Sequence, residues 1–135
     1  MKSYKYFLKL FCVCLITSSY IVGCASPSGT LNLTKGLSRT DATIISLIPR
    51  MDYSCKFNSV GDRDITNNPS KVIVPPGDNM VDISCRSIFS SFPIYIGGSL
   101  VFKAEAGREY KVYLEDMCLK IRDSHAGKIL DAYCH

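Results

Sequence analysis

The residue whose neighbours point most clearly to chemistry is Cys24, a thiol placed directly after an export-like segment. Three lysines within the first nine residues give a positive start, an apolar run over residues 10–20 follows, and the small residue Gly23 precedes the thiol. This order is typical of a secretory signal peptide. The run contains Thr and Ser and is short for a spanning helix, which needs about 20 predominantly apolar residues. We expect residues 1–23 to be a cleaved signal, with plain secretion without lipid and an uncleaved helix as open alternatives.

The four residues that end this segment, Ile21-Val22-Gly23-Cys24, resemble the lipobox of bacterial lipoproteins, usually written Leu-Ala-Gly-Cys. The last two residues match outright, and aliphatic residues replace the first two. The resemblance implies that the Cys24 thiol receives a diacylglycerol as a thioether and that the chain is cut after Gly23. Two or more acyl chains anchor a protein stably in a membrane. Ala25 and Ser26 follow in place of the Asp that retains such proteins in the inner membrane, which implies an outer-membrane destination. These residues do not identify the leaflet, and we expect the domain to face the periplasm.

The remaining thiols predict two disulfides. Of the seven cysteines, two lie in the apolar run of the signal and one would carry the lipid. The other four are an even set in an oxidising compartment, where pairing is expected, and four cysteines allow three connectivities. A hairpin centred on Ala126 would place Cys118 opposite Cys134, where facing Cα atoms lie about 4.5 Å apart. We therefore favour Cys118–Cys134, which leaves Cys55–Cys85.

The histidines, serines and carboxylates elsewhere in the chain form no pattern that predicts catalysis or cofactor binding. Four residues near the C-terminus have the right types for tetrahedral zinc. They are Cys118, His125, Cys134 and His135. Their spacings fit no familiar zinc module, and an oxidising compartment favours the disulfide instead. The chain has no Cys-x-x-Cys-His haem motif and no Gly-x-Ser-x-Gly nucleophile elbow. Carboxylates beside expected turns, which we expect to be solvated, are Asp62, Asp64, Glu105 and Glu109. We predict no enzyme, no cofactor, no metal and no small-molecule substrate.

The charge of the chain is largely a property of the signal. The full sequence carries +4, but the first 23 residues hold three of its sixteen basic residues and none of its twelve acidic ones, which leaves about +1. A nucleic-acid-binding domain needs a clustered basic face. We therefore expect no nucleic-acid partner, and residues 24–135 have the size of one ordinary domain.

Alternation of apolar and polar residues predicts an all-β domain over residues 42–135. The clearest alternating segments are 53–58, 80–85 and 110–115, separated by turns at 61–64, 75–78 and 106–109. Period-two patterning with turns about ten residues apart is typical of an antiparallel sandwich or barrel, and no segment carries a helical period. We predict an antiparallel β-sandwich of immunoglobulin-like or transthyretin-like architecture.

Two motifs add a second resemblance. Val74-Pro75-Pro76-Gly77 precedes an alternating strand, and Phe102-Lys103-Ala104-Glu105-Ala106-Gly107-Arg108-Glu109-Tyr110 leads into another. This order is similar to small exported bacterial β-sandwiches, among them uncharacterised lipoproteins and PEGA-like surface modules. The similarity covers most of residues 42–131, although the Pro-Glu-Gly-Ala tetrapeptide is missing and the cysteines are additional. It implies a fold and a location, with no catalytic activity.

Residues 24–41 predict a tether between the lipid and the domain. They are rich in Ser, Thr, Gly and Asn and show no convincing period. A flexible linker of roughly 17 residues would reach about 20–25 Å and hold the domain clear of the lipid headgroups. Leu31, Leu33 and Leu37 leave open the alternative of an edge strand packed on the domain.

The segment 88–98 is the candidate binding surface. It is apolar and aromatic and is interrupted by Pro93 and a pair of glycines. If it projected from the sandwich, Phe89, Phe92 and Tyr95 would form an exposed patch of the kind that marks a partner site. We favour the other interpretation, a crossover strand or loop covering the end of the core, because a small domain needs most of its aromatic residues inside.

Two function classes follow. The first is a non-enzymatic lipoprotein of the cell envelope, held to the membrane through Cys24, that acts as a binding or structural module with an envelope protein as a possible partner. The second is a periplasmic inhibitor similar to lipidated lysozyme inhibitors, which are also small, β-rich and disulfide-bonded. Tyr53-Ser54-Cys55 resembles their aromatic-x-Cys strand, but their Ser-Gly-x-x-Tyr type of motif is missing.

Overall fold

The computed structural model describes residues 29–38 and 40–135, and it shows an all-β chain with no helix in those ranges. The expected signal and Cys24 lie outside the described residues. Within them, no helix is long and apolar enough to cross a membrane. The strands are β1 (Thr30–Asn32), β2 (Thr43–Leu47), β3 (Tyr53–Val60), β4 (Arg63–Asp64), β5 (Lys71–Val74), β6 (Gly77–Ser87), β7 (Tyr95–Ala104), β8 (Glu109–Glu115), β9 (Cys118–Asp123) and β10 (Ile129–Cys134).

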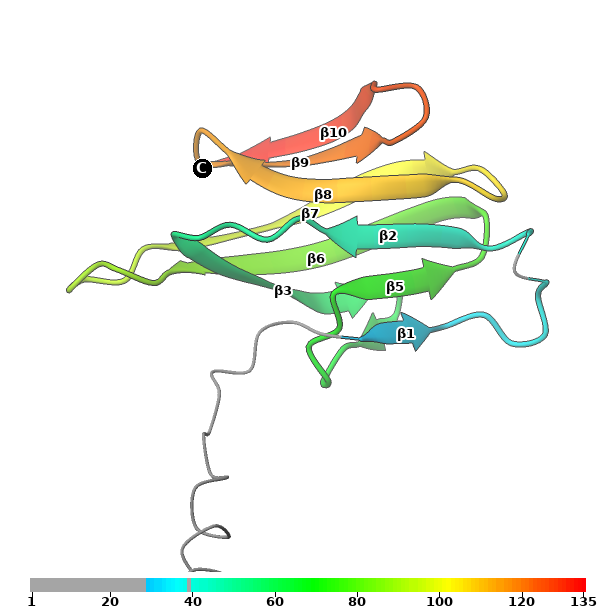
Figure 1. Ribbon diagram of the computed structural model, residues 1–135, viewed down its shortest axis with the longest axis horizontal. Coiled ribbons are helices and arrows are strands. Elements are labelled where there is room, and N and C mark those ends of the chain that lie inside the picture. Colours follow the sequence, from blue (N-terminus) through cyan, green and yellow to red (C-terminus); the bar gives the residue numbers. More distant parts are fainter. Residues whose placement is uncertain (1–28, 39) are drawn as a thin grey trace, which may run out of the picture.

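The strands form two stacked sheets, as Figure 1 shows. The larger sheet has the order β1-β5-β2-β8-β9-β10 and the smaller one β4-β3-β6-β7. The two-sheet architecture is that of a β-sandwich. Most neighbours are antiparallel as predicted, but β1 pairs with β5 and β2 with β8 in parallel. The prediction of a purely antiparallel sandwich was therefore wrong for these two pairs, which join segments far apart in the sequence.

The alternation read from the sequence builds a single core between the sheets. On β6 the buried residues Val81, Ile83 and Cys85 alternate with more exposed polar ones, and on β8 the residues Tyr110, Val112 and Leu114 do the same. Residues on alternate positions of a strand point to the same face, so each sheet contributes one apolar face. The largest fully buried side chains are Tyr110, Phe57, Ile45, Ile83, Ile96, Leu100, Leu119 and Ile121.

Both disulfides link residues that face each other across antiparallel strands. Cys55 pairs with Cys85 between β3 and β6, with Cα atoms 4.0 Å apart, and Cys118 pairs with Cys134 between β9 and β10, at 4.1 Å. The second pair follows the register that the hairpin about Ala126 predicts. The connectivity favoured from the sequence is thus the one present in the structure.

Asp123 fixes the turn of the β9–β10 hairpin. One carboxylate oxygen accepts hydrogen bonds from the backbone N–H groups of His125, at 2.7 Å, and Ala126, at 3.2 Å, while the other lies 2.9 Å from the guanidinium of Arg108. Burial alone would raise the pKa of Asp123, but these N–H groups and the charge of Arg108 together hold it below its ordinary value of 3.8. The buried carboxylate is therefore charged and joins this turn to the start of β8.

β10 also closes one side of the sandwich, because it lies against the free edge of β7. The backbone N–H of Val101 donates to a carboxylate oxygen of Asp131 at 2.7 Å. Gly98 lies beneath the ring of Tyr133, and a Cβ atom at that glycine would come within 2.3 Å of the ring. The glycine is thus required by the close approach of two strands from different sheets.

The first strand corrects the predicted tether. β1 extends the larger sheet beside β5, and Leu33 packs against the core. The edge-strand alternative is therefore the one that the structure shows for residues 30–33, and the flexible tether of residues 24–41 was wrong over this part. Leu37 stays exposed.

We call the end of the sandwich that holds the β6–β7 loop the tip end; it lies at the left of Figure 1, and β1 begins well short of it. Thr30 pairs with Lys71, and Lys71 pairs with Ser46, one residue before β2 ends. The loop that follows β2 reaches the base of the β6–β7 loop, where the N–H of Ile88 donates to the carbonyl of Asp52 at 2.9 Å. Residues 47–52 thus cover the distance from the level of Thr30 to the tip end, and the described chain enters the sandwich part-way along it.

Candidate functional site

The β6–β7 hairpin runs past the rest of the sandwich and ends in the loop 88–94, which we call the tip (Figure 1). The ladder between β6 and β7 continues to the pair Arg86–Tyr95. Beyond that pair the loop runs past the ends of the strands of the larger sheet (Figure 1), so its aromatic side chains are little covered by the residues described. Phe89 is 81% exposed, Phe92 is 86% exposed and Tyr95 is 61% exposed. The favoured interpretation, a segment covering the end of the core, was wrong, and the projecting patch is what the structure shows.

Local hydrogen bonds define the shape of the tip. The N–H of Ser87 donates to the carbonyl of Ile94 at 2.9 Å, and the N–H of Ile94 donates to the Ser87 hydroxyl at 2.8 Å. At the far end, the Ser90 hydroxyl donates to the carbonyl of Phe92 at 2.5 Å and accepts from the N–H of Phe92 at 3.2 Å. Backbone polar groups that would otherwise need water are therefore satisfied inside the loop.

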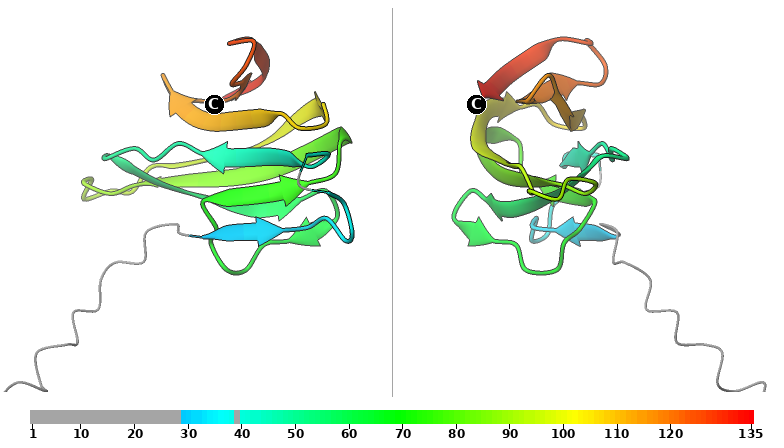
Figure 2. Two further views of the ribbon diagram at one scale, coloured as in Figure 1. Left: turned by 45° about the vertical axis from the view of Figure 1, so that its right-hand side comes forward. Right: turned by 90° about the vertical axis from the view of Figure 1, so that its left-hand side faces the viewer.

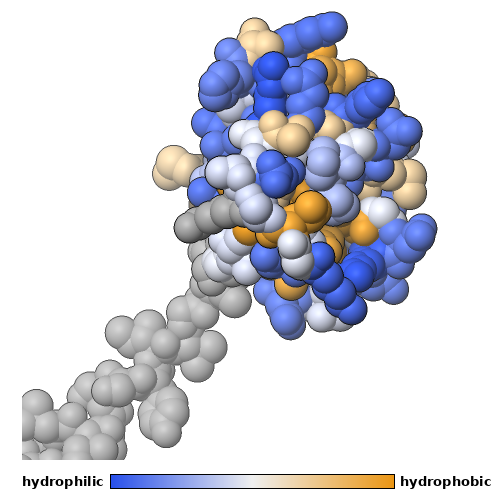
Figure 3. Space-filling view, turned by 90° about the vertical axis from the view of Figure 1, so that its right-hand side faces the viewer, coloured by the Kyte–Doolittle hydropathy of each residue, from blue (hydrophilic) through white to orange (hydrophobic). Residues whose placement is uncertain are grey.

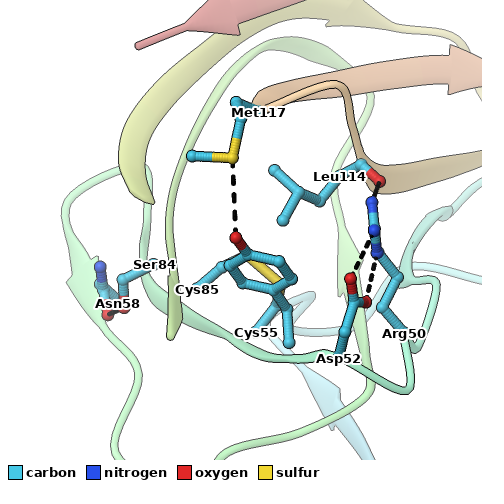
Figure 4. The surroundings of a disulfide bond; sticks show 9 residues. Arg50, Asp52, Cys55, Asn58, Ser84, Cys85, Leu114 and Met117 are labelled. Atoms are coloured by element: carbon cyan, nitrogen blue, oxygen red, sulfur yellow. Dashed lines mark hydrogen bonds and ion pairs between the residues drawn. A yellow bond between two sulfur atoms is a disulfide. The ribbon is translucent and has the colours of Figure 1, made fainter. Parts of the chain in front are cut away.

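A second loop at the tip end, residues 48–52, lies beside the hairpin and presents Met51, which is 90% exposed. Arg50 holds this loop in place through two bonds of 2.6 Å to Asp52 and one of 2.9 Å to the carbonyl of Leu114 (Figure 4). The side-chain hydrogen bonds between Arg50 and Asp52 raise the pKa of the guanidinium and lower that of the carboxyl group. Both groups stay charged at neutral pH, so their charges largely offset each other.

Exposed apolar residues are gathered at this end. Met51, Phe92 and Phe89 are the three most exposed large hydrophobic residues of those described, and the most exposed one away from this end is Val101, at 58%. The tip end faces the viewer in the right-hand view of Figure 2. The opposite end, shown in Figure 3, has hydrophilic side chains around a hydrophobic cluster at its centre. Exposed apolar residues gathered at one end of a domain are typical of an interaction site.

A polar hollow of about 630 Å³ opens on the outer face of the smaller sheet, directly beside the tip. Its cationic groups are Lys56 and Arg86, and the guanidinium of Arg86 lies 5.8 Å from the centre of the Tyr95 ring. The side-chain oxygen of Asn68 is buried at its wall and accepts no hydrogen bond from the residues described. No carboxylate lines the hollow in that part of the chain, so it favours a ligand with negative charge.

The other residues considered for chemistry do not come together. Cys118 and Cys134 form a disulfide, His125 lies in the β9–β10 turn and His135 is the last residue. In the ranges that the structure describes, no three His, Cys, Asp or Glu side chains gather where they could hold a metal ion. Of the four carboxylates beside turns, Asp62 and Asp64 are exposed, Glu105 pairs with Arg108, and Glu109 accepts a hydrogen bond from Ser46.

The sequence reading therefore named the aromatic residues of the site and missed its basic part. Lys56 and Arg86 stand on neighbouring strands at solvent-facing positions, and the alternation of β3 and β6 carries this information. Only the pairing of the two strands brings the two cations beside the tip. No family of proteins, no curated protein and no solved structure matches this chain.

Proposed function

We propose that this protein is an exported, lipid-anchored binding module of a bacterial cell envelope, without catalytic activity, whose binding site is the tip end of the sandwich. The observation that carries the binding role is the exposure of Phe89, Phe92 and Met51 on two loops at the same end of the sandwich. Exposed aromatic and Met side chains are costly in water and are the residue types enriched in the centres of interfaces.

Export and anchoring are supported by the thiol chemistry. Two disulfides suit an oxidising compartment, where such bonds persist. Cys24 is the remaining cysteine outside the expected signal, and its sequence context resembles a lipobox. With Ala25 and Ser26 after it, we place the anchor in the outer membrane with the domain in the periplasm.

The inhibitor function is the second candidate, and the chemistry of the tip favours the first. Inhibitors of the lysozyme type insert a polar loop into an enzyme cleft, whereas the projecting loop here carries Phe89, Phe92 and Ile94. An apolar loop suits a partner that offers an apolar surface.

For the detailed architecture of the sandwich, we propose an immunoglobulin-like or transthyretin-like fold related to PEGA-like surface modules. Two features support this proposal: the two-sheet architecture, and turns at the two motifs that carry the resemblance. Pro75 and Pro76 lie between β5 and β6, and Gly107 adopts a φ of 72° between β7 and β8.

Anchoring is tested by fractionation of cells that produce the full chain. We expect the wild-type protein in the detergent-extracted membrane fraction and the Cys24→Ser variant as an unprocessed precursor. Cys12→Ser, which changes a thiol inside the signal, is the matched control and should behave as wild type. Equal processing of all three chains would contradict the anchor.

Binding at the tip is tested by a photo-crosslinking amino acid in place of Phe92 in living cells. We expect adducts from this position and none from Ile129, which is half-exposed at the opposite end of the sandwich. Adducts of equal yield at both positions would contradict a dedicated binding end.

A further inference from the structure

We propose that the occupant of the tip end is the phospholipid bilayer that holds the anchor, so that the domain leans on its own membrane with the tip as the contact. This proposal rests on the proposed acylation of Cys24. It adds a second membrane contact, built from the folded domain, to the contact made by the lipid.

The short stretch of chain between Cys24 and the sandwich keeps the domain near the membrane. The carbonyl of Gly29 accepts hydrogen bonds from the N–H and the hydroxyl of Ser70, both at 3.1 Å, so the chain enters the sandwich at this point. Gly29 is only five residues from Cys24, and five residues span at most about 18 Å when fully extended. Because β1 takes up residues that would otherwise lengthen the tether, the anchor holds the sandwich close to the bilayer, where the exposed tip meets the membrane when the domain leans.

The apolar residues of this end suit the boundary between headgroups and acyl chains. Met51, Phe89 and Phe92 are each more than 80% exposed, and Ile88 and Ile94 add half-exposed aliphatic surface beside them. Apolar and aromatic side chains on an amphipathic surface enter this boundary, and Tyr residues concentrate at the level of the headgroups. Tyr95, at the base of the tip, stands where such a belt residue would be.

The basic hollow adds the charge that an anionic lipid surface attracts. Lys56 and Arg86 make no ion pair with the residues described, whereas Arg50, on the neighbouring loop, is paired with Asp52. Lys and Arg near an anionic leaflet are attracted to it over a short range. The hollow is lined in part by Ile88 and Ser90 of the tip and by Tyr95 at its base, so a lipid phosphate can meet the cations while the aromatic rings enter the bilayer.

The absence of tryptophan from this chain makes the test direct. The full-length lipoprotein carrying Phe92→Trp is purified from envelopes and reconstituted in vesicles of phosphatidylethanolamine and phosphatidylglycerol, with or without bromine on the acyl chains. Ile129→Trp at the opposite end is the matched control. We expect blue-shifted emission and strong loss of intensity on brominated lipid for Phe92→Trp only. Equal, unquenched emission from both positions would overturn the proposal and leave the tip for a protein partner.

The same samples separate this proposal from the anchor on which it rests. An acylated protein with an unquenched Phe92→Trp refutes docking alone, whereas a mass without acyl groups refutes the anchor and the docking geometry together. Lys56→Gln with Arg86→Gln, in the Phe92→Trp background, tests the hollow. Weaker quenching in vesicles that contain anionic lipid supports its role, and unchanged quenching overturns it.

Discussion

Gly98→Ala should be far more damaging than the same change at its neighbour Gly97, because only Gly98 lies under an aromatic ring. A Cβ atom at Gly98 would come within 2.3 Å of Tyr133, whereas at Gly97 the nearest atom would be the carbonyl oxygen of Ile83 at 3.6 Å. The first distance forces the ring, and with it β10, to move away from β7. The second is an ordinary contact.

The two variants should differ in sign as well as in size. Overpacking costs typically about 1–3 kcal/mol, so Gly98→Ala should lower the free energy of unfolding by that amount. Gly in the middle of a strand is less stable than Ala by about 0.5–1 kcal/mol, so Gly97→Ala should be slightly stabilising. Urea unfolding followed by circular dichroism measures both, and each kcal/mol moves Tm by about 4–8 °C in a domain of this size.

A double-mutant cycle then assigns the cost of Gly98→Ala to the ring. Adding Tyr133→Ala should recover most of the loss, because the atoms that clash are gone, and residues in contact show coupling energies of about 0.5–3 kcal/mol. Equal stabilities for Gly97→Ala and Gly98→Ala, or additive effects in the cycle, would refute the closure of β10 over β7.

Three further predictions concern the stability of the domain. Asp123→Asn should cost about 1.5–3 kcal/mol at neutral pH, because it removes charged hydrogen bonds from a buried site, whereas the exposed control Asp62→Asn should change stability by less than about 0.5 kcal/mol. The pKa of Asp123 is lower in the folded protein than its ordinary value of 3.8, which stands for the unfolded chain. Its contribution to the free energy of unfolding is therefore complete above pH 3.8 and is lost as the pH falls through the folded pKa. Acid titration should thus destabilise wild type more than Asp123→Asn. Replacing both cysteines of a bridge by Ala should lower the free energy of unfolding, because the unfolded chain regains the entropy of the closed loop. The loss should be about 3 kcal/mol for the 118–134 bridge, with a sequence separation of 16, and about 3.6 kcal/mol for the 55–85 bridge, with a separation of 30. The reverse order in urea unfolding would contradict this loop-entropy argument. Phe92→Ser should leave the free energy of unfolding within about 0.5 kcal/mol of wild type, and a larger loss would show that the tip packs on the core.

Local patterns predicted much of this fold. Alternation over residues 53–58 and 80–85 placed the buried faces of β3 and β6, because a strand with one buried face tolerates no shift of one residue. The hairpin about Ala126 set the pairing of Cys118 with Cys134 for the same reason, since a short turn fixes which residues face each other.

The features that the sequence did not predict depend on distant segments. The parallel pairing of β2 with β8 joins residues more than 60 positions apart, and no local pattern encodes it. β1 has three residues, too few for a period to show. Phe89 and Phe92 are exposed because the opposite sheet ends short of them, and the sequence does not show how far each sheet extends.

The intact mass of the protein extracted from envelopes tests the central claim most directly. If the protein is an anchored and oxidised lipoprotein, we expect the mass of residues 24–135, increased by the acyl groups on Cys24 and reduced by the hydrogens lost in two disulfides. The mass of all 135 residues, with every thiol free and no acyl group, would contradict it.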